Sequence, residues 1–131
     1  MLCLVIFGIF DFGRAINYWL DANHLANEGA RWVVVNQDLG TPLPAYLRGK
    51  ADTTELRSGG TRSLPAPLQV EVCYPNGTDP GDYVLVSAEV DFHWLPFLTS
   101  VAGIDTSTTL TGTATMRLEQ QPSNHPATGG C

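Results

Sequence analysis

The sequence predicts an α+β fold: one long N-terminal helix, anchored in a membrane at its start, packs on a small antiparallel sheet of three or slightly more strands. Two observations predict it. About 35 N-terminal residues contain no proline and show helical periodicity, and three later stretches alternate apolar with polar residues. At 131 residues the chain fits one domain. We expect a transmembrane and assembly helix at 1–35, a loop-rich crossover with short helical turns at 36–67, a sheet head at 68–119 and a flexible C-terminal tail at 120–131.

The N-terminal helix changes character along its length. The run from Met1 to Phe10 carries no charged side chain and no proline. Beyond it the residues recur at spacings of three and four, which places each set on one helix face. A helix that continues to Val35 is about 50 Å long, against an average of about a dozen residues in globular proteins. The alternative is a long core helix. The apolar face consists of Ala15, Trp19, Ala22, Ala26, Ala30 and Val33, and the polar face of Asn17, Asp21, His24 and Glu28.

The apolar run is short for a membrane anchor. Spanning a bilayer takes roughly 20 apolar residues, and this run ends at Asp11. A secretory signal peptide would need a basic start and an A-x-A cleavage site, which the segment lacks. We therefore expect further apolar residues upstream of Met1.

Three segments carry a resemblance to a known family: GIFDFGRA (Gly8–Ala15), NEGARW (Asn27–Trp32) and TATMRLE (Thr113–Glu119). Together they resemble the TadE-like family, whose members are minor pilin or pseudopilin components of tight-adherence (Flp-type) pili. The resemblance covers most of the chain and is strongest in the helix and the last strand.

The resemblance implies a non-enzymatic structural or assembly subunit of a bacterial pilus or a related secretion apparatus. It implies a single pass through the cytoplasmic membrane, a head outside the cytoplasm, and other pilins and pilus-assembly proteins as partners. The residues expected at the membrane boundary or in assembly contacts are Gly8, Asp11, Phe12, Gly13, Arg14, Glu28, Gly29 and Arg31.

Two charge pairs in the helix have the same spacing. Asp11 and Arg14 lie three positions apart and can meet on one helix face. We interpret them as marking the outer membrane boundary and setting helix register in the assembly. The alternative is an interfacial pair without partner specificity. Glu28 and Arg31 invite the same two interpretations, with the second favoured because they lie in the soluble part.

Small residues on the helix indicate close packing. The alanines of the apolar face, together with Gly29, would let a sheet or a second helix approach closely. The alternative is an alanine-rich helix selected for its helix propensity. In the crossover, Asp52 with Glu55 resembles a helix capping box.

Three alternating segments predict the strands: Leu68–Tyr74, Val84–Phe92 and Leu110–Leu118. The turn-rich segment Pro75–Asp82 predicts a hairpin between the first two. A longer apolar connection, His93–Asp105, joins the second strand to the third. One apolar face per strand is typical of a sheet covered on one side.

The three cysteines differ in expected chemistry. Cys3 lies in the apolar run, and we expect it to behave as a small hydrophobic residue. Cys73 and Cys131 fall in the exported part, where a disulfide persists. They either form a bridge that ties the tail to the first strand, or leave a free terminal thiol.

Composition excludes several function classes. The net charge is −6, and the seven basic residues are scattered, which argues against nucleic acid as a partner. His24, His93 and His125 lack metal-ligand spacing, and no phosphate loop or nucleophile motif is present. We expect no enzyme activity, cofactor or metal. The alternative function is a membrane-anchored extracytoplasmic binding module that recognises a surface ligand through the sheet and the segment HWLPFL (His93–Leu98).

Overall fold

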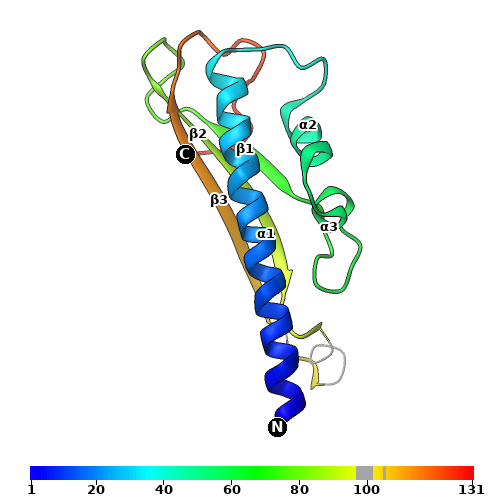
Figure 1. The fold of residues 1–131 in the computed structure, drawn as a ribbon. Helices are drawn as coiled ribbons and strands as arrows, with labels where there is room; N and C mark the ends of the chain where they lie inside the picture. The colour runs from blue at the N-terminus through cyan, green and yellow to red at the C-terminus, as the bar shows by residue number, and fades with distance from the viewer. Residues whose placement is uncertain (97–101, 105) are drawn as a thin grey trace.

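A computed structural model describes residues 1–96, 102–104 and 106–131 of the chain (Figure 1). The elements follow in the order α1 (Leu2–Val34), α2 (Leu43–Lys50), α3 (Thr54–Ser58), β1 (Gln69–Cys73), β2 (Tyr83–His93) and β3 (Ser107–Arg117). The α+β prediction with a long, apolar N-terminal helix is confirmed.

The sheet is antiparallel with the order β1-β2-β3. Val86 lies at its centre and pairs with Val72 on one side and Ala114 on the other. Every second residue of β2 from Val84 to Phe92 is buried, which confirms the alternation expected from the sequence. The buried face is therefore one continuous apolar surface, and a helix can cover it.

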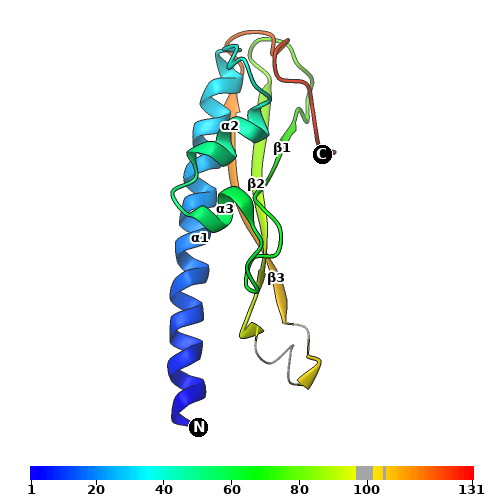
Figure 2. The ribbon, with the colours of Figure 1, turned by 90° about the vertical axis from the view of Figure 1, so that its right-hand side faces the viewer.

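Helix α1 covers that face along most of the sheet, and its N-terminal end projects beyond the strands (Figure 2). Two residues lie elsewhere than predicted. Trp19 is exposed, and its neighbour Tyr18 packs inward against Phe92, with ring centroids 5.8 Å apart. Asp21 is buried rather than on the polar face. The buried residues of α1 are Asp11, Ala15, Tyr18, Asp21, Ala22, Leu25, Ala26, Gly29, Ala30, Val33 and Val34.

The closest approach of α1 to the sheet occurs at Gly112 in β3. A Cβ atom on Gly112 would lie 2.5 Å from the backbone nitrogen of Asn23 and 2.6 Å from the carbonyl carbon of Ala22. Gly29 lies two turns farther along the same face of α1, where an added Cβ atom would be 2.7 Å from the Leu47 side chain in α2 and 3.3 Å from Val86 in β2. Of the two interpretations of the small residues, close packing therefore describes Ala22 and Gly29.

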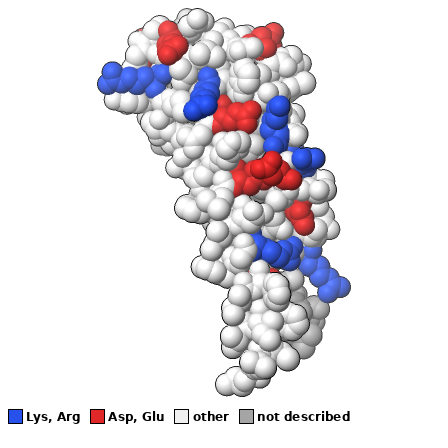
Figure 3. Space-filling model, viewed as in Figure 1, with Lys and Arg blue, Asp and Glu red and all other residues white. Residues whose placement is uncertain are grey.

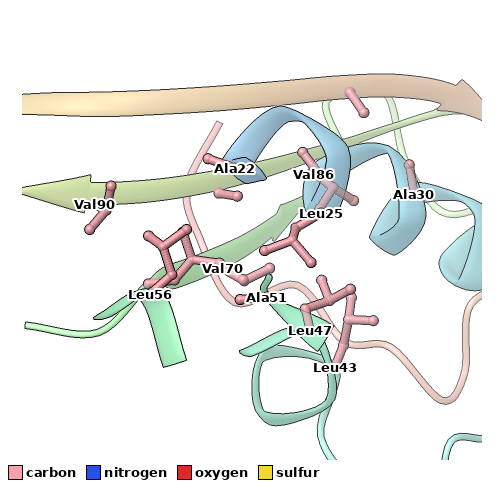
Figure 4. Packing of buried hydrophobic residues seen from close by; sticks show 14 of the residues in the cluster. Ala22, Leu25, Ala30, Leu43, Leu47, Ala51, Leu56, Val70, Val86 and Val90 are labelled. Carbon is pink, nitrogen blue, oxygen red and sulfur yellow. The ribbon is translucent and has the colours of Figure 1, made fainter. Parts of the chain in front are cut away.

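Helices α2 and α3 lie beside α1 and complete the core. Figure 4 shows Leu25 of α1 near Leu47 of α2, in the same cluster as Val70 and Val86 of the sheet. Leu25, Leu47 and Leu56 of α3 are fully buried. The crossover helices therefore cover β1, and α1 covers β2 and β3.

Asp21 fastens this crossover to α1. Its Oδ2 atom accepts hydrogen bonds from the backbone N–H groups of Asp52 and Thr53, at 3.0 and 3.3 Å. The capping box expected from Asp52 and Glu55 is wrong. Thr53 is the N-cap residue of α3 and makes no side-chain cap hydrogen bond.

The C-terminal segment 120–131, expected to be a flexible tail, contacts the head at several points. Cys73 and Cys131 form a disulfide with their Cα atoms 5.7 Å apart. Val72 exchanges hydrogen bonds with Thr128, and the buried His125 ring lies 2.9 Å from the carbonyl oxygen of Gln37. The segment therefore covers the outer edge of β1, the position at which an unpaired strand is open to further pairing.

The apolar connection His93–Asp105 lies partly outside the described residues, which leave out 97–101 and 105. Its described start follows β2 closely. The backbone N–H of Trp94 donates to Thr106, and the indole N–H donates to Thr108.

Candidate functional site

The most distinctive surface of the described chain is the N-terminal end of α1. Its side chains from Met1 to Phe10 are largely exposed, including Leu2 at 75%, Ile9 at 67% and Phe10 at 68%. In the view of Figure 3, the described atoms at the narrow lower end carry no basic or acidic side chain. Such a contiguous apolar surface is typical of a site that meets lipid or protein.

Helix α1 is long and apolar enough to cross a membrane, judged by length and composition. Of the 18-residue stretch of α1 that is apolar enough to cross a membrane, only 17% is buried inside the structure. The core helix of a soluble domain, the alternative interpretation, would be mostly buried. The exposed end therefore fits a single-pass membrane anchor.

Asp11 lies where the apolar end meets the head. The residue is 9% exposed, and its Oδ2 atom accepts a hydrogen bond from the backbone N–H of Leu95 at 2.6 Å. A charged group near lipid is costly unless it is paired. Here the end of β2 supplies the donor.

Arg14 has different partners from Asp11. Its guanidinium donates to the hydroxyl oxygen of Ser63 at 3.3 Å and to that of Tyr18 at 3.1 Å. Within the described chain the predicted pairing of Asp11 with Arg14 is not formed, because each side chain turns to a different segment of the head. The two charges thus fasten α1 to the end of β2 and to the crossover.

Aromatic rings surround this boundary. Phe12, which is 59% exposed, stacks on Trp94 at 6.5 Å, and Trp94 meets Phe92 edge-on at 4.9 Å. Trp19 stands exposed farther along the helix. Tryptophan and tyrosine are enriched at membrane–water interfaces, where an apolar ring and a polar atom face different surroundings.

The other expected boundary and assembly residues are scattered. A Cβ atom on Gly8 or Gly13 would meet nothing within 4 Å, so both leave the helix surface open. Glu28 and Arg31 line an open hollow on the outer side of α1, together with Trp32. The structure therefore places Asp11 and Phe12 against the end of β2 and Arg14 against the crossover. Glu28 and Arg31 lie apart from them, nearer the far end of the helix.

The geometry of α1 agrees with a comparison of the sequence with family models. Residues 1–31 match the model of the TadE-like protein family. The resemblance stated from GIFDFGRA and NEGARW is thereby confirmed for the helix. The match covers most of α1, and the TadE-like family is a pilus-associated family. No curated protein and no solved structure matches the chain.

Among the described residues, no group of three or more His, Cys, Asp or Glu side chains is arranged to hold a metal ion. The acidic turn after β1 uses Asp82 internally, where the Asp79 backbone N–H donates to its carboxylate at 3.3 Å. The surface described above consists of the exposed apolar end of α1, followed by polar contacts of Asp11 and Arg14 with the head.

Several residues of this boundary were not found from the sequence. Ser63 and Leu95 contribute a hydroxyl group and a backbone N–H from segments 49 and 84 positions away from their partners. No local pattern marks such residues. Tyr18 carried a usable signal, because it lies three residues after Ala15 and four before Ala22.

Proposed function

We propose that this protein is a minor pilin or pseudopilin of a tight-adherence pilus or a related secretion apparatus. The apolar end of α1 sits in the cytoplasmic membrane, and the sheet head lies outside the cytoplasm. The protein acts by assembly with other pilins and pilus-assembly proteins and does not catalyse a reaction. The observation that carries the proposal is the exposed apolar end of a TadE-like helix that projects beyond the sheet.

The polar contacts at the boundary support the same proposal. A helix that leaves the membrane must keep its direction if the head is to be presented in one orientation. Asp11 and Arg14 fix that direction by binding the end of β2 and the crossover. The apolar end remains largely exposed, as contact with lipid or with neighbouring helices requires.

The experiment is deletion of the gene in its native host, followed by imaging of surface pili and complementation. Intact protein should restore pili. Val5→Lys, which places a charge on an exposed apolar position, should not. His24→Lys is the matched control, because it places the same charge on an exposed position of the same helix within the head.

Topology is measured in the same strains. Protease added to spheroplasts should cut the head, and alkaline washing should leave the chain in the membrane fraction. Pili that persist after deletion would contradict the assembly role. They would favour the anchored binding module, in which the head recognises a surface ligand while the chain stays monomeric.

A further inference from the structure

A shallow pocket lies where α1 leaves its apolar end. One side is formed by the exposed side chains of Ile9 and Phe10, and the other by Arg14, Asn17, Thr53 and Glu55. Helix α1 supplies the apolar side, and the start of α3 closes the polar side. The pocket therefore changes from apolar to polar along the helix axis, as a phospholipid does from chain to headgroup.

The polar side carries one charge of each sign. Arg14 is held in position by Ser63 and Tyr18, which use two of the five N–H donors of its guanidinium. Glu55 is half-buried, and no donor from the described residues reaches its carboxylate. The pocket thus offers N–H donors for an anion and a carboxylate for a cation, with no net charge.

The level of the pocket along the helix matches a headgroup. Arg14 lies four residues beyond Phe10, which is about 6 Å along a helix axis. The headgroup layer on each side of a bilayer extends about 5–8 Å beyond the hydrocarbon. If Phe10 marks the edge of the hydrocarbon, Arg14 reaches the lipid phosphates.

We propose that this pocket binds the headgroup of a zwitterionic phospholipid with a primary ammonium group, a phosphatidylethanolamine. The Arg14 guanidinium donates hydrogen bonds to the phosphate oxygens, and the Glu55 carboxylate accepts one from the ammonium. Phosphatidylcholine fits less well, because its trimethylammonium group has no N–H to donate. An anionic headgroup without an amine places its negative charge near Glu55. The assignment rests on the proposed membrane anchoring of α1.

The test uses the full chain in detergent micelles, titrated with dioctanoyl phosphatidylethanolamine or dioctanoyl phosphatidylcholine and followed by native mass spectrometry. We expect about tenfold tighter binding of the ethanolamine lipid, as one charge-assisted hydrogen bond provides. Glu55→Gln should abolish this preference. Arg14→Gln should weaken binding of both lipids about tenfold, and Arg14→Lys should restore part of it.

Matched controls remove the same charges elsewhere. Lys50→Gln and Glu119→Gln, both at exposed positions in the head, should leave both affinities unchanged. Circular dichroism of each variant shows whether it is folded. Equal affinity of the unaltered chain for the two lipids, or a preference that survives Glu55→Gln, would overturn the proposal.

Two further measurements distinguish a failure of the lipid assignment from a failure of the proposed function. Phosphoethanolamine is added alone; if it binds as tightly as the lipid, the site recognises a soluble headgroup and the lipid assignment is wrong. Retention in alkali-washed membranes tests the anchor itself. A chain that stays in membranes yet shows no lipid preference overturns this inference alone, whereas a chain washed from membranes overturns the proposed function and, with it, the assignment that rests on it.

Discussion

The backbone N–H of Leu95 donates a hydrogen bond to the carboxylate of Asp11, and the two residues are 84 positions apart in the chain. Leu95 has a φ of 43°, in the left-handed region that a leucine seldom adopts. The hydrogen bond from α1 helps to hold this turn at the end of β2. The start of α1 and the segment that follows β2 are therefore directly connected.

Replacing Asp11 tests this connection. Asp11→Ala should lower the free energy of unfolding by about 1–3 kcal/mol, because it leaves the Leu95 N–H without its acceptor. Asp11→Asn keeps an oxygen acceptor and should cost less. Denaturant unfolding of the full chain in detergent measures both, and equal losses for the two variants would contradict a role as acceptor.

Exchanging the charges of Asp11 and Arg14 should not restore assembly. The doubly substituted chain, Asp11→Arg with Arg14→Asp, would recover function only if the two side chains paired with each other. Their partners are instead Leu95 and Ser63. Pilus imaging after complementation decides it, with each single substitution as the reference; assembly better than both singles would show a direct pair.

A side chain at Gly112 should separate α1 from the sheet. Gly112→Ala places a methyl group within 2.7 Å of the backbone of Ala22, which cannot yield as a flexible side chain does. We expect a loss of about 1–3 kcal/mol in stability. Gly49→Ala is the control: its Cβ meets nothing within 4 Å in α2, and it should stabilise by up to about 1 kcal/mol.

The disulfide should contribute to stability through the chain it encloses. Cys73 and Cys131 are 58 positions apart, for which the chain-entropy model gives about 4 kcal/mol. Replacing both by serine should lower the unfolding midpoint, whereas Cys3→Ser, at an exposed free cysteine, should not. Intact mass should rise by two hydrogens on reduction. A monomer whose mass is unchanged by reductant would show that the bridge is absent.

Tyr74 should make the head sensitive to alkali. Burial raises the pKa of its phenol to about 12, and its hydroxyl donates to the carbonyl oxygen of His125 at 2.5 Å. The raised pKa means that the folded state keeps the proton that the unfolded state loses above about pH 10. This stability is complete below pH 10 and is lost as the pH rises toward about 12.

Phenolate absorbance measures the titration of Tyr74. The absorbance should contain a component that titrates near pH 12, and Tyr74→Phe should remove that component. Stability curves of the two chains should then differ in slope between about pH 10 and 12. Parallel curves would show that another group governs the alkaline transition.

Local periodicity was sufficient to predict the elements of the fold. The strands alternate along β2 from Val84 to Phe92, and α1 contains no proline from Leu2 to Val34, so pattern and structure agree. Periodicity placed Trp19, rather than Tyr18, on the helix face that packs on the sheet, and that prediction was wrong. The small residues Ala15 and Ala22 lie on the buried face of α1, and Tyr18 lies between them on that face and packs on Phe92 of β2.

The sequence predicted two charged residues of the candidate site but not the groups that bind them. The sequence pointed to Asp11 and Arg14, but their partners come from distant segments and leave no spacing to detect. Asp21 was placed with the polar residues because its type is usually solvated. Its burial follows from Asp52 and Thr53, whose N–H groups need an acceptor at the turn between α2 and α3.

Helix α1 runs from Leu2 to Val34 as one helix and is fastened to the head along most of its length. It is therefore expected to move as a rigid body, without bending at an internal position. A rod about 50 Å long that tilts by about 10° moves its far end by about 9 Å. Any reorientation of the lipid-facing end displaces the tip of the head, where the C-terminal segment crosses the end of α1, by a comparable distance.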